Sequence, residues 1–210
     1  MTSDKQESYR TIERRGAAEF IVKGSKFIAV IAQTSNRGEF QNFIEHERKK
    51  FSDATHHCWA FRIGTERIEE LSGDDGEPSG SAGLPILRVI IGSGLINVSC
   101  VVTRYFGGTK LGVGGLMRAY TQSASAALKN AIIVEKLTME RLSIELPYDV
   151  HNEFFASLTR LGGNILDSKF AEKVSLLFDV PSRSVTEIVS IVAGLTHGER
   201  LPKKIKVENK

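Results

Sequence analysis

One segment of the chain has an unusual density of glycine, and it restricts the fold more than any other feature. Five of the nine residues from Gly107 to Gly115 are glycine, which the interior of a helix or strand does not tolerate. The residues before it, Val98 to Tyr105, are apolar and β-branched and predict a buried strand. From Leu116 onward, apolar residues recur at helical spacing. The sequence therefore predicts a strand, a shaped loop and a helix, in that order.

Positive and aromatic side chains surround the glycine-rich segment. Arg104 precedes it, Lys110 lies within it and Arg118 follows it, while Tyr105 and Phe106 add flat ring faces. A loop that leads into a helix also presents free backbone N–H groups, which stabilise an anion. We therefore predict that this loop binds phosphate or nucleic acid. The predicted binding residues are Arg104, Tyr105, Phe106, Gly107, Gly108, Lys110, Gly112, Gly114, Gly115 and Arg118.

The glycines also have a second interpretation, which stays open at this point. Glycine occurs where two elements pack too closely for a side chain. The segment contains no GxxxxGK followed by Ser or Thr, and no clean GxGxxG with an acidic residue about twenty positions later. Its sequence therefore gives little support to a nucleotide-binding enzyme.

A second loop, Leu71 to Pro85, contains four glycines, two prolines and three serines. Three of its residues within a stretch of four are acidic. Such oxygen ligands can bind a divalent cation, although Asp and Ser in these loops more often cap helices and fill turns. We expect no metal and no other cofactor. The candidate residues of this second loop are Asp74, Asp75, Glu77, Ser79 and Ser81.

The composition argues against several classes of protein. The hydrophobic share of 41% and the charged share of 25% are ordinary for a soluble globular protein. No apolar run approaches the roughly 18 to 20 residues of a membrane span, and the polar N-terminus lacks the core of a signal peptide. Cys58 and Cys100 lie far apart in apolar runs, which is typical of reduced core cysteines. We expect a cytoplasmic protein without membrane contact. The net charge of +3 permits nucleic-acid binding but does not argue for it.

The hydrophobic pattern predicts two α+β domains, residues 1–137 and 138–210. After a frayed start of about a dozen residues, the first domain has predicted strands at Glu19–Val22, Lys26–Ala32, His57–Ile63 and Ile132–Glu135, and helices at Gly38–Lys50 and Pro85–Ile91. The second has strands at Arg141–Leu146, Ile165–Phe170, Val174–Val180 and Leu201–Val207, and helices at Tyr148–Leu161 and from Pro181 to about Ala193. Its βαββαβ order is the ferredoxin-like plan.

Three stretches together resemble the IMPACT family in its bacterial form: VVTRYFGGTKLGVGGLMRAY, DDGEPSGSAGLPIL before it, and the strand that opens with ATHHCWAF. The resemblance covers nearly the whole chain, and Ser81 departs from the usual Thr but keeps the hydroxyl. It implies that the first domain has the fold of the second domain of a small-subunit ribosomal protein superfamily, which includes domain IV of elongation factor G. It implies that the second domain is ferredoxin-like, as is domain V of that factor. It also implies a role in translation, since eukaryotic relatives regulate translation initiation.

The first of three hypotheses is a translation-associated binding or regulatory protein that contacts RNA or the ribosome. Arg104 and Arg118 contact phosphates in this hypothesis, and Lys110 acts as a point charge. Tyr105 or Phe106 stacks on an unpaired base, but only one of them, because neighbours on a strand point to opposite faces.

The other two hypotheses use the acidic loop. In an Mg-dependent hydrolase or phosphoryl-transfer enzyme, the acidic residues hold Mg²⁺ and His56 or His57 moves protons. No nucleophile and base are recognisable, so no catalytic residue is predicted and an enzyme is less favoured. In a protein–protein docking module, whose partner is a translation-related protein, Asp75 or Glu77 neutralises Arg104 or Lys110 across a cleft.

Overall fold

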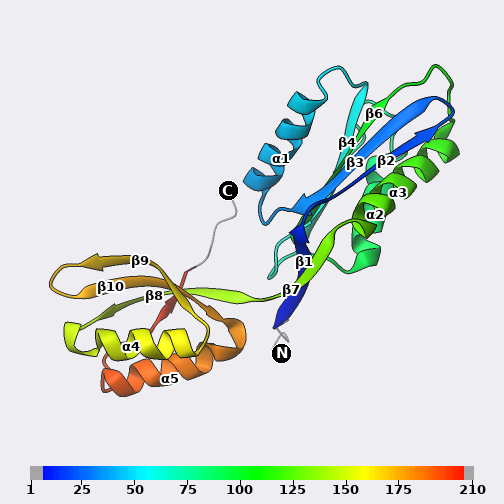
Figure 1. The fold of residues 1–210 in the computed structure, drawn as a ribbon. Coiled ribbons are helices and arrows are strands. Elements are labelled where there is room, and N and C mark those ends of the chain that lie inside the picture. Colours follow the sequence, from blue (N-terminus) through cyan, green and yellow to red (C-terminus); the bar gives the residue numbers. More distant parts are fainter. Residues whose placement is uncertain (1–6, 206–210) are drawn as a thin grey trace. The chain divides into compact units, whose positions relative to one another are not determined.

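The computed structural model describes residues 7–205, and this part of the chain forms two compact units (Figure 1). Residues 9–136 form the front unit, and residues 137–205, with residues 7 and 8, form the back unit. Each unit combines helices with an antiparallel sheet, so the predicted α+β class is confirmed. None of the helices between residues 7 and 205 has the length and apolar character that crossing a membrane requires.

The front unit is built around a five-stranded antiparallel sheet with β6 at its centre. In their order across the sheet, the strands are β2 (Gly16–Val22), β3 (Ser25–Gln33), β6 (Val98–Tyr105), β4 (His56–Ile63) and β5 (Glu69–Gly73). Seven of the eight residues of β6 are buried, which confirms the predicted buried strand. A tight turn joins β2 to β3, with Lys23 and Gly24 both at positive φ.

Helices cover this sheet on both faces. On one face, α1 (Arg37–Lys50) packs Phe40 and Ile44 against Phe61 and Val101. On the opposite face lie α2 (Gly83–Ser93) and α3 (Val113–Lys129), whose buried residues share a core with the even-numbered residues of β6. Successive residues of a strand point to opposite faces, so the odd-numbered residues of β6 lie on the face of α1. This alternation decides where the candidate site residues of β6 point.

A separate two-stranded sheet contains β1 (Ser8–Arg14) and β7 (Ile132–Leu137). The prediction of a frayed start is therefore wrong from Ser8 onward, and residues 1–6 lie outside the described residues. Ile12 is fully buried in the front core, and the hydroxyl of Thr11 donates a hydrogen bond of 3.2 Å to the carbonyl oxygen of Asn97. Local periodicity did not reveal this strand, because Ile12 is its one buried apolar residue and the residues around it are mostly polar.

Both candidate loops are shorter than predicted. We expected the central helix to start at Leu116, but α3 begins at Val113, so the glycine loop spans only residues 106–112. Gly114 and Gly115 lie in the first turn of α3, where the penalty that glycine carries in helix interiors is small. Likewise β5 continues to Gly73 and α2 begins at Gly83, which leaves residues 74–82 as the acidic loop.

The back unit has the predicted βαββαβ order. Its elements are β8 (Met139–Leu146), α4 (Tyr148–Arg160), β9 (Asn164–Phe170), β10 (Val174–Pro181), the short 3₁₀ helix η1 (Ser182–Ser184), α5 (Val185–Leu195) and β11 (Lys203–Lys204). The sheet order is β11-β8-β10-β9, and apolar residues of β8 and β10 form a core with the two helices. The last helix starts later than predicted, since Pro181 still belongs to β10. The last strand is shorter than predicted over the described residues, and residues 206–207 lie outside them.

Candidate functional site

The acidic loop is held in place by its own carboxylates. The Asp74 carboxylate accepts hydrogen bonds from the N–H groups of Gly80 (2.8 Å), Ala82 (3.0 Å) and Gly83 (2.8 Å), the last two at the start of α2. Burial alone raises the pKa of Asp74, but these three backbone donors outweigh it and hold the pKa below its ordinary value. Asp74 therefore caps α2 from a distant position in the sequence.

Asp75 joins the acidic loop to α1 and β4. Its carboxylate pairs with Arg48 at 2.9 Å and accepts the N–H of His57 at 2.7 Å. The ring Nδ1 of His56 lies 2.8 Å from the carbonyl oxygen of Asp75. The ring Nε2 of His57 lies 3.2 Å from the carbonyl oxygen of Phe51, and burial lowers the pKa of this histidine. Both histidines thus have structural contacts within the fold.

Glu77 forms the buried contact between the two loops. Its Oε1 pairs with the guanidinium of Arg104 at 2.6 Å, and the two side chains are only 3% and 5% exposed. The hydroxyl of Tyr120 donates to the same oxygen at 2.7 Å, and the thiol of Cys58 lies 3.3 Å from that hydroxyl. Burial raises the pKa of both Cys58 and Tyr120, so neither is an activated nucleophile at neutral pH.

The prediction that Arg104 contacts phosphate needs correction. Arg104 is an even-numbered residue of β6, so its side chain points into the core rather than to solvent. Besides Glu77, the guanidinium donates to the hydroxyl of Ser25 at 3.2 Å. The guanidinium carbon lies 5.4 Å from the ring centroid of Phe27 and 5.6 Å from that of Phe106. Arg104 therefore joins the base of the glycine loop to the acidic loop, as the docking hypothesis foresaw for this pair of charges.

The three acids of the acidic loop thus face different partners. The Asp74 carboxylate contacts the start of α2, and the Asp75 carboxylate contacts Arg48 and β4. The Glu77 carboxylate contacts Arg104 and Tyr120. Of the two serines of this loop, Ser79 is exposed and Ser81 is fully buried. Within residues 7–205, no group of three or more His, Cys, Asp or Glu side chains is arranged to hold a metal ion.

The glycines of the central segment fall into two kinds. At Gly107 a side chain would collide with the carbonyl group of Gly24, because the turn between β2 and β3 lies against the glycine loop (Figure 1). The packing interpretation therefore holds for Gly107, as it does more weakly for Gly115, whose Cβ would lie 3.1 Å from Leu111. Gly108 and Gly112 have positive φ angles of 82° and 71° and open space around them.

The glycine loop leaves the start of α3 bare. Gly112 is the N-cap residue and provides no side-chain cap, and the first turn contains no acidic residue. The first intrahelical bond runs from the N–H of Leu116 to Gly112 at 2.9 Å, so the N–H groups of the three residues before Leu116 have no partner within the helix. A side chain on Gly114 would meet only the flexible end of Arg118, at 3.7 Å.

The other cations and aromatic residues that were predicted to bind a ligand do not all face the same way. Lys110 and Arg118 are exposed, and neither forms an ion pair with another residue between positions 7 and 205. Tyr105 lies on the face of α1, where its hydroxyl donates to Asp53 at 2.8 Å. Phe106 stands at the end of β6 with 48% of its surface exposed. Phe106 is therefore the aromatic residue that the glycine loop presents to solvent.

Sequence reasoning missed several residues that build this site. Ser25 accepts the N–H of Gly107 at 3.1 Å, Tyr120 binds Glu77, and Thr55 accepts the N–H of Phe106 at 3.1 Å. These residues come from three distant parts of the chain. Ser25 and Thr55 directly precede the segments of β3 and of β4 that pair with β6 on either side, and Tyr120 lies on α3. Tyr120 alone carried a signal, because its helical spacing placed it on the buried face of α3.

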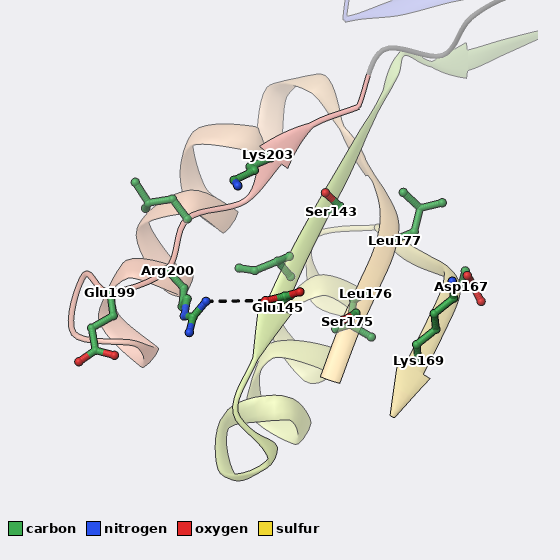
Figure 2. Close-up of a pocket in the computed structure, with 12 residues that line it drawn as sticks. Ser143, Glu145, Asp167, Lys169, Ser175, Leu176, Leu177, Glu199, Arg200 and Lys203 are labelled. Atoms are coloured by element: carbon green, nitrogen blue, oxygen red, sulfur yellow. Dashed lines mark ion pairs between the residues drawn. The ribbon is translucent and has the colours of Figure 1, made fainter. Parts of the chain in front are cut away.

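A hollow of about 530 Å³ lies on the back unit, on the sheet face turned away from α4 and α5 (Figure 2). Its lining includes three acidic and three basic side chains: Glu145, Asp167, Glu199, Lys169, Arg200 and Lys203. Arg200 and Glu145 face each other at 3.8 Å. The charges balance, so this hollow has no preference for an anion, and it was not predicted from the sequence.

Comparison with known proteins places the glycine loop in a recognised domain. The family model of the Impact N-terminal domain matches residues 23–128. The chain is 34% identical to IMPACT family member YvyE of Bacillus subtilis (strain 168) over 192 residues, which is 91% of this chain and 88% of the relative. It is 33% identical to IMPACT family member YigZ of Escherichia coli (strain K12) over 179 residues, 84% of this chain and 88% of the relative.

Among the solved structures that this chain resembles is one that matches nearly its whole length. It is titled "Crystal structure of an hypothetical protein" and has 30% sequence identity and a TM-score of 0.79. The match covers 97% of this chain and 100% of that one.

Proposed function

Because this chain belongs to the IMPACT family, we propose that it is a translation-associated regulatory protein of the cytoplasm that binds RNA, alone or in the ribosome, through the start of α3. The observation that carries the proposal is the bare first turn of α3, with the exposed cations Lys110 and Arg118 beside it in the sequence. The family resemblance supports the translation part of the proposal, and the chemistry of this surface supports the RNA part.

Electrostatics favour a phosphate group at this position. A helix start carries a partial positive charge from its unpaired N–H groups, and α3 is 17 residues long. Soluble helices usually place Ser, Thr, Asp or Asn there, but α3 has Gly112 and no acid in its first turn. The exposed glycines allow a ligand backbone to approach closely. Lys110 and Arg118 add two whole charges.

The buried Glu77–Arg104 pair holds the glycine loop in position. It joins the glycine loop to the acidic loop, and Ser25 attaches both Arg104 and Gly107 to the turn between β2 and β3. A loop that is fixed before binding loses less conformational entropy when its ligand arrives. Arg104 thus acts as a positioning residue in the proposal.

The test is the salt dependence of binding to purified ribosomes and to transfer RNA. The double variant Lys110→Ala/Arg118→Ala should bind more weakly than the unchanged chain, with the slope of log K against log salt reduced by roughly 1.4 to 1.8, because two phosphate contacts are lost. The matched control is Arg88→Ala/Lys129→Ala, which removes two exposed cations of α2 and α3 away from the glycine loop.

Equal affinity and equal slope in the two double variants would show that the start of α3 is not the contact. Ribosome association that survives nuclease treatment would point to a translation-related protein as the partner instead of RNA.

A further inference from the structure

Phe106 is an exposed ring on a rigid support. It is the first residue of the glycine loop, and its N–H group is held by the hydroxyl oxygen of Thr55 at 3.1 Å. The ring centroid lies 5.6 Å from the guanidinium carbon of Arg104, whose own position is determined by Glu77 and Ser25. One side of the ring therefore contacts a buried cation, while 48% of the residue faces solvent.

The surroundings of Phe106 favour a flat partner over an apolar protein surface. The other loop residues are three glycines, Thr109, Lys110 and the partly buried Leu111, so Phe106 is the one large apolar side chain that residues 106–112 expose. A protein partner that covers an aromatic anchor usually needs a wider apolar patch. A nucleobase needs only one exposed ring face, and every base has such a face.

We propose that Phe106 is a stacking platform for an unpaired base, and that the site therefore selects single-stranded over double-stranded RNA. This inference rests on the proposed RNA binding and adds the class of RNA. Bases within a duplex are already stacked on their neighbours, so they cannot cover Phe106 without unpairing. The phosphates on either side of the base would be held by the cations and by the bare start of α3.

The experiment uses two fluorescein-labelled probes, a 12-nucleotide oligoadenylate RNA and a 12-base-pair RNA duplex, with the full chain. The unchanged protein should bind the single strand more tightly. Phe106→Leu should weaken single-strand binding about tenfold, leave duplex binding unchanged and leave the salt slope unchanged for both probes. Phe106→Tyr should restore single-strand binding. Lys110→Ala/Arg118→Ala should weaken the binding of both probes.

A second readout follows the ring itself. In Phe106→Trp, oligoadenylate should quench the tryptophan emission more than in the unchanged protein, whose one tryptophan is Trp59. A Phe106→Leu variant that melts at the unchanged temperature and binds the single strand with full affinity overturns the stacking proposal while RNA binding stands. Equal loss of both probes in that variant also overturns it. Binding of neither probe nor ribosomes by the unchanged protein overturns both proposals.

Discussion

At the scale of single residues, Arg104 shows how position on a strand decides the role of a charge. It lies next to Tyr105 and Phe106 in a cationic and aromatic segment, so the sequence favoured a ligand contact. The side chain instead shares the buried face of β6 with Cys100 and Val102. An arginine there needs a buried acid, because an isolated buried charge is strongly unfavourable, and Glu77 provides it.

We expect Arg104→Ala to destabilise the front unit by about 3 to 5 kcal/mol, since it leaves the Glu77 carboxylate buried without its cation. Arg118→Ala, at an exposed position, should change the free energy of unfolding by no more than about 0.5 kcal/mol. Urea unfolding followed by circular dichroism measures both.

The double variant Arg104→Gln/Glu77→Gln gives the control. It should lose less stability than the sum of its two single variants, because no unpaired charge remains. Strict additivity would contradict the coupling that the buried pair implies.

At the scale of elements, α2 depends on an acid that precedes it by nine residues. The residue at its N-cap, Ala82, has no side chain that can cap the helix. Asp74 takes over this task, since a sharp loop with Asp75 and Gly76 at positive φ turns the chain back over the helix start. In this structure the acidic residues of the loop cap α2 and form ion pairs. Capping and turn formation is the commoner role of Asp and Ser in such loops.

Asp74→Ala should lower the free energy of unfolding by about 0.5 to 2 kcal/mol at neutral pH, because the α2 amides lose their cap. Asp74→Asn should lose less, since the amide oxygen still accepts a hydrogen bond. Chemical denaturation at pH 7 checks the order of the two variants.

The pH dependence of the same cap follows from the lowered pKa of Asp74 in the folded state. Its charge contributes stability that is fully present above the unfolded pKa of about 3.9 and is lost as the pH falls through the lower folded value. The difference in free energy of unfolding between the unchanged protein and Asp74→Asn should therefore become smaller below about pH 4. A gap of equal size at pH 3 and pH 7 would rule out this charged cap.

At the scale of the whole molecule, no buried cluster of residues 7–205 is shared by the front and back units. The front unit has one cluster on each face of its five-stranded sheet, and the back unit has one between α4, α5 and the four-stranded sheet. Each unit therefore has a buried apolar core of its own, as an independent domain requires.

We expect a fragment of residues 1–137 to fold alone and to keep the RNA affinity of the full chain, since it contains the glycine loop and both strands of the β1–β7 pair. Circular dichroism, thermal melting and binding to the oligoadenylate probe test this. An unfolded fragment would show that the back unit is required for the stability of the front one.

Much of the element order was predictable from local patterns. The βαββαβ back unit and the strand, loop and helix of the centre follow from apolar periodicity, which reports on one face of one element at a time. β1 was missed because it has one buried apolar residue, Ile12, and its other buried residue, Thr11, is polar. The start of α3 was placed too late, because glycine density masked a first turn that tolerates glycine.

The amino-acid sequence by itself determined which groups gather in the centre of this protein: a buried strand, flexible glycines, three cations and two aromatic rings. Only the tertiary structure decided which of them face solvent. Alternation along β6 and its register with β3 and β4 bury Arg104 against Glu77 and turn Tyr105 toward Asp53. Phe106 and Lys110 in the glycine loop and Arg118 on α3 stay exposed. The physical reason is that burial depends on neighbours far away in the chain, which no local pattern contains.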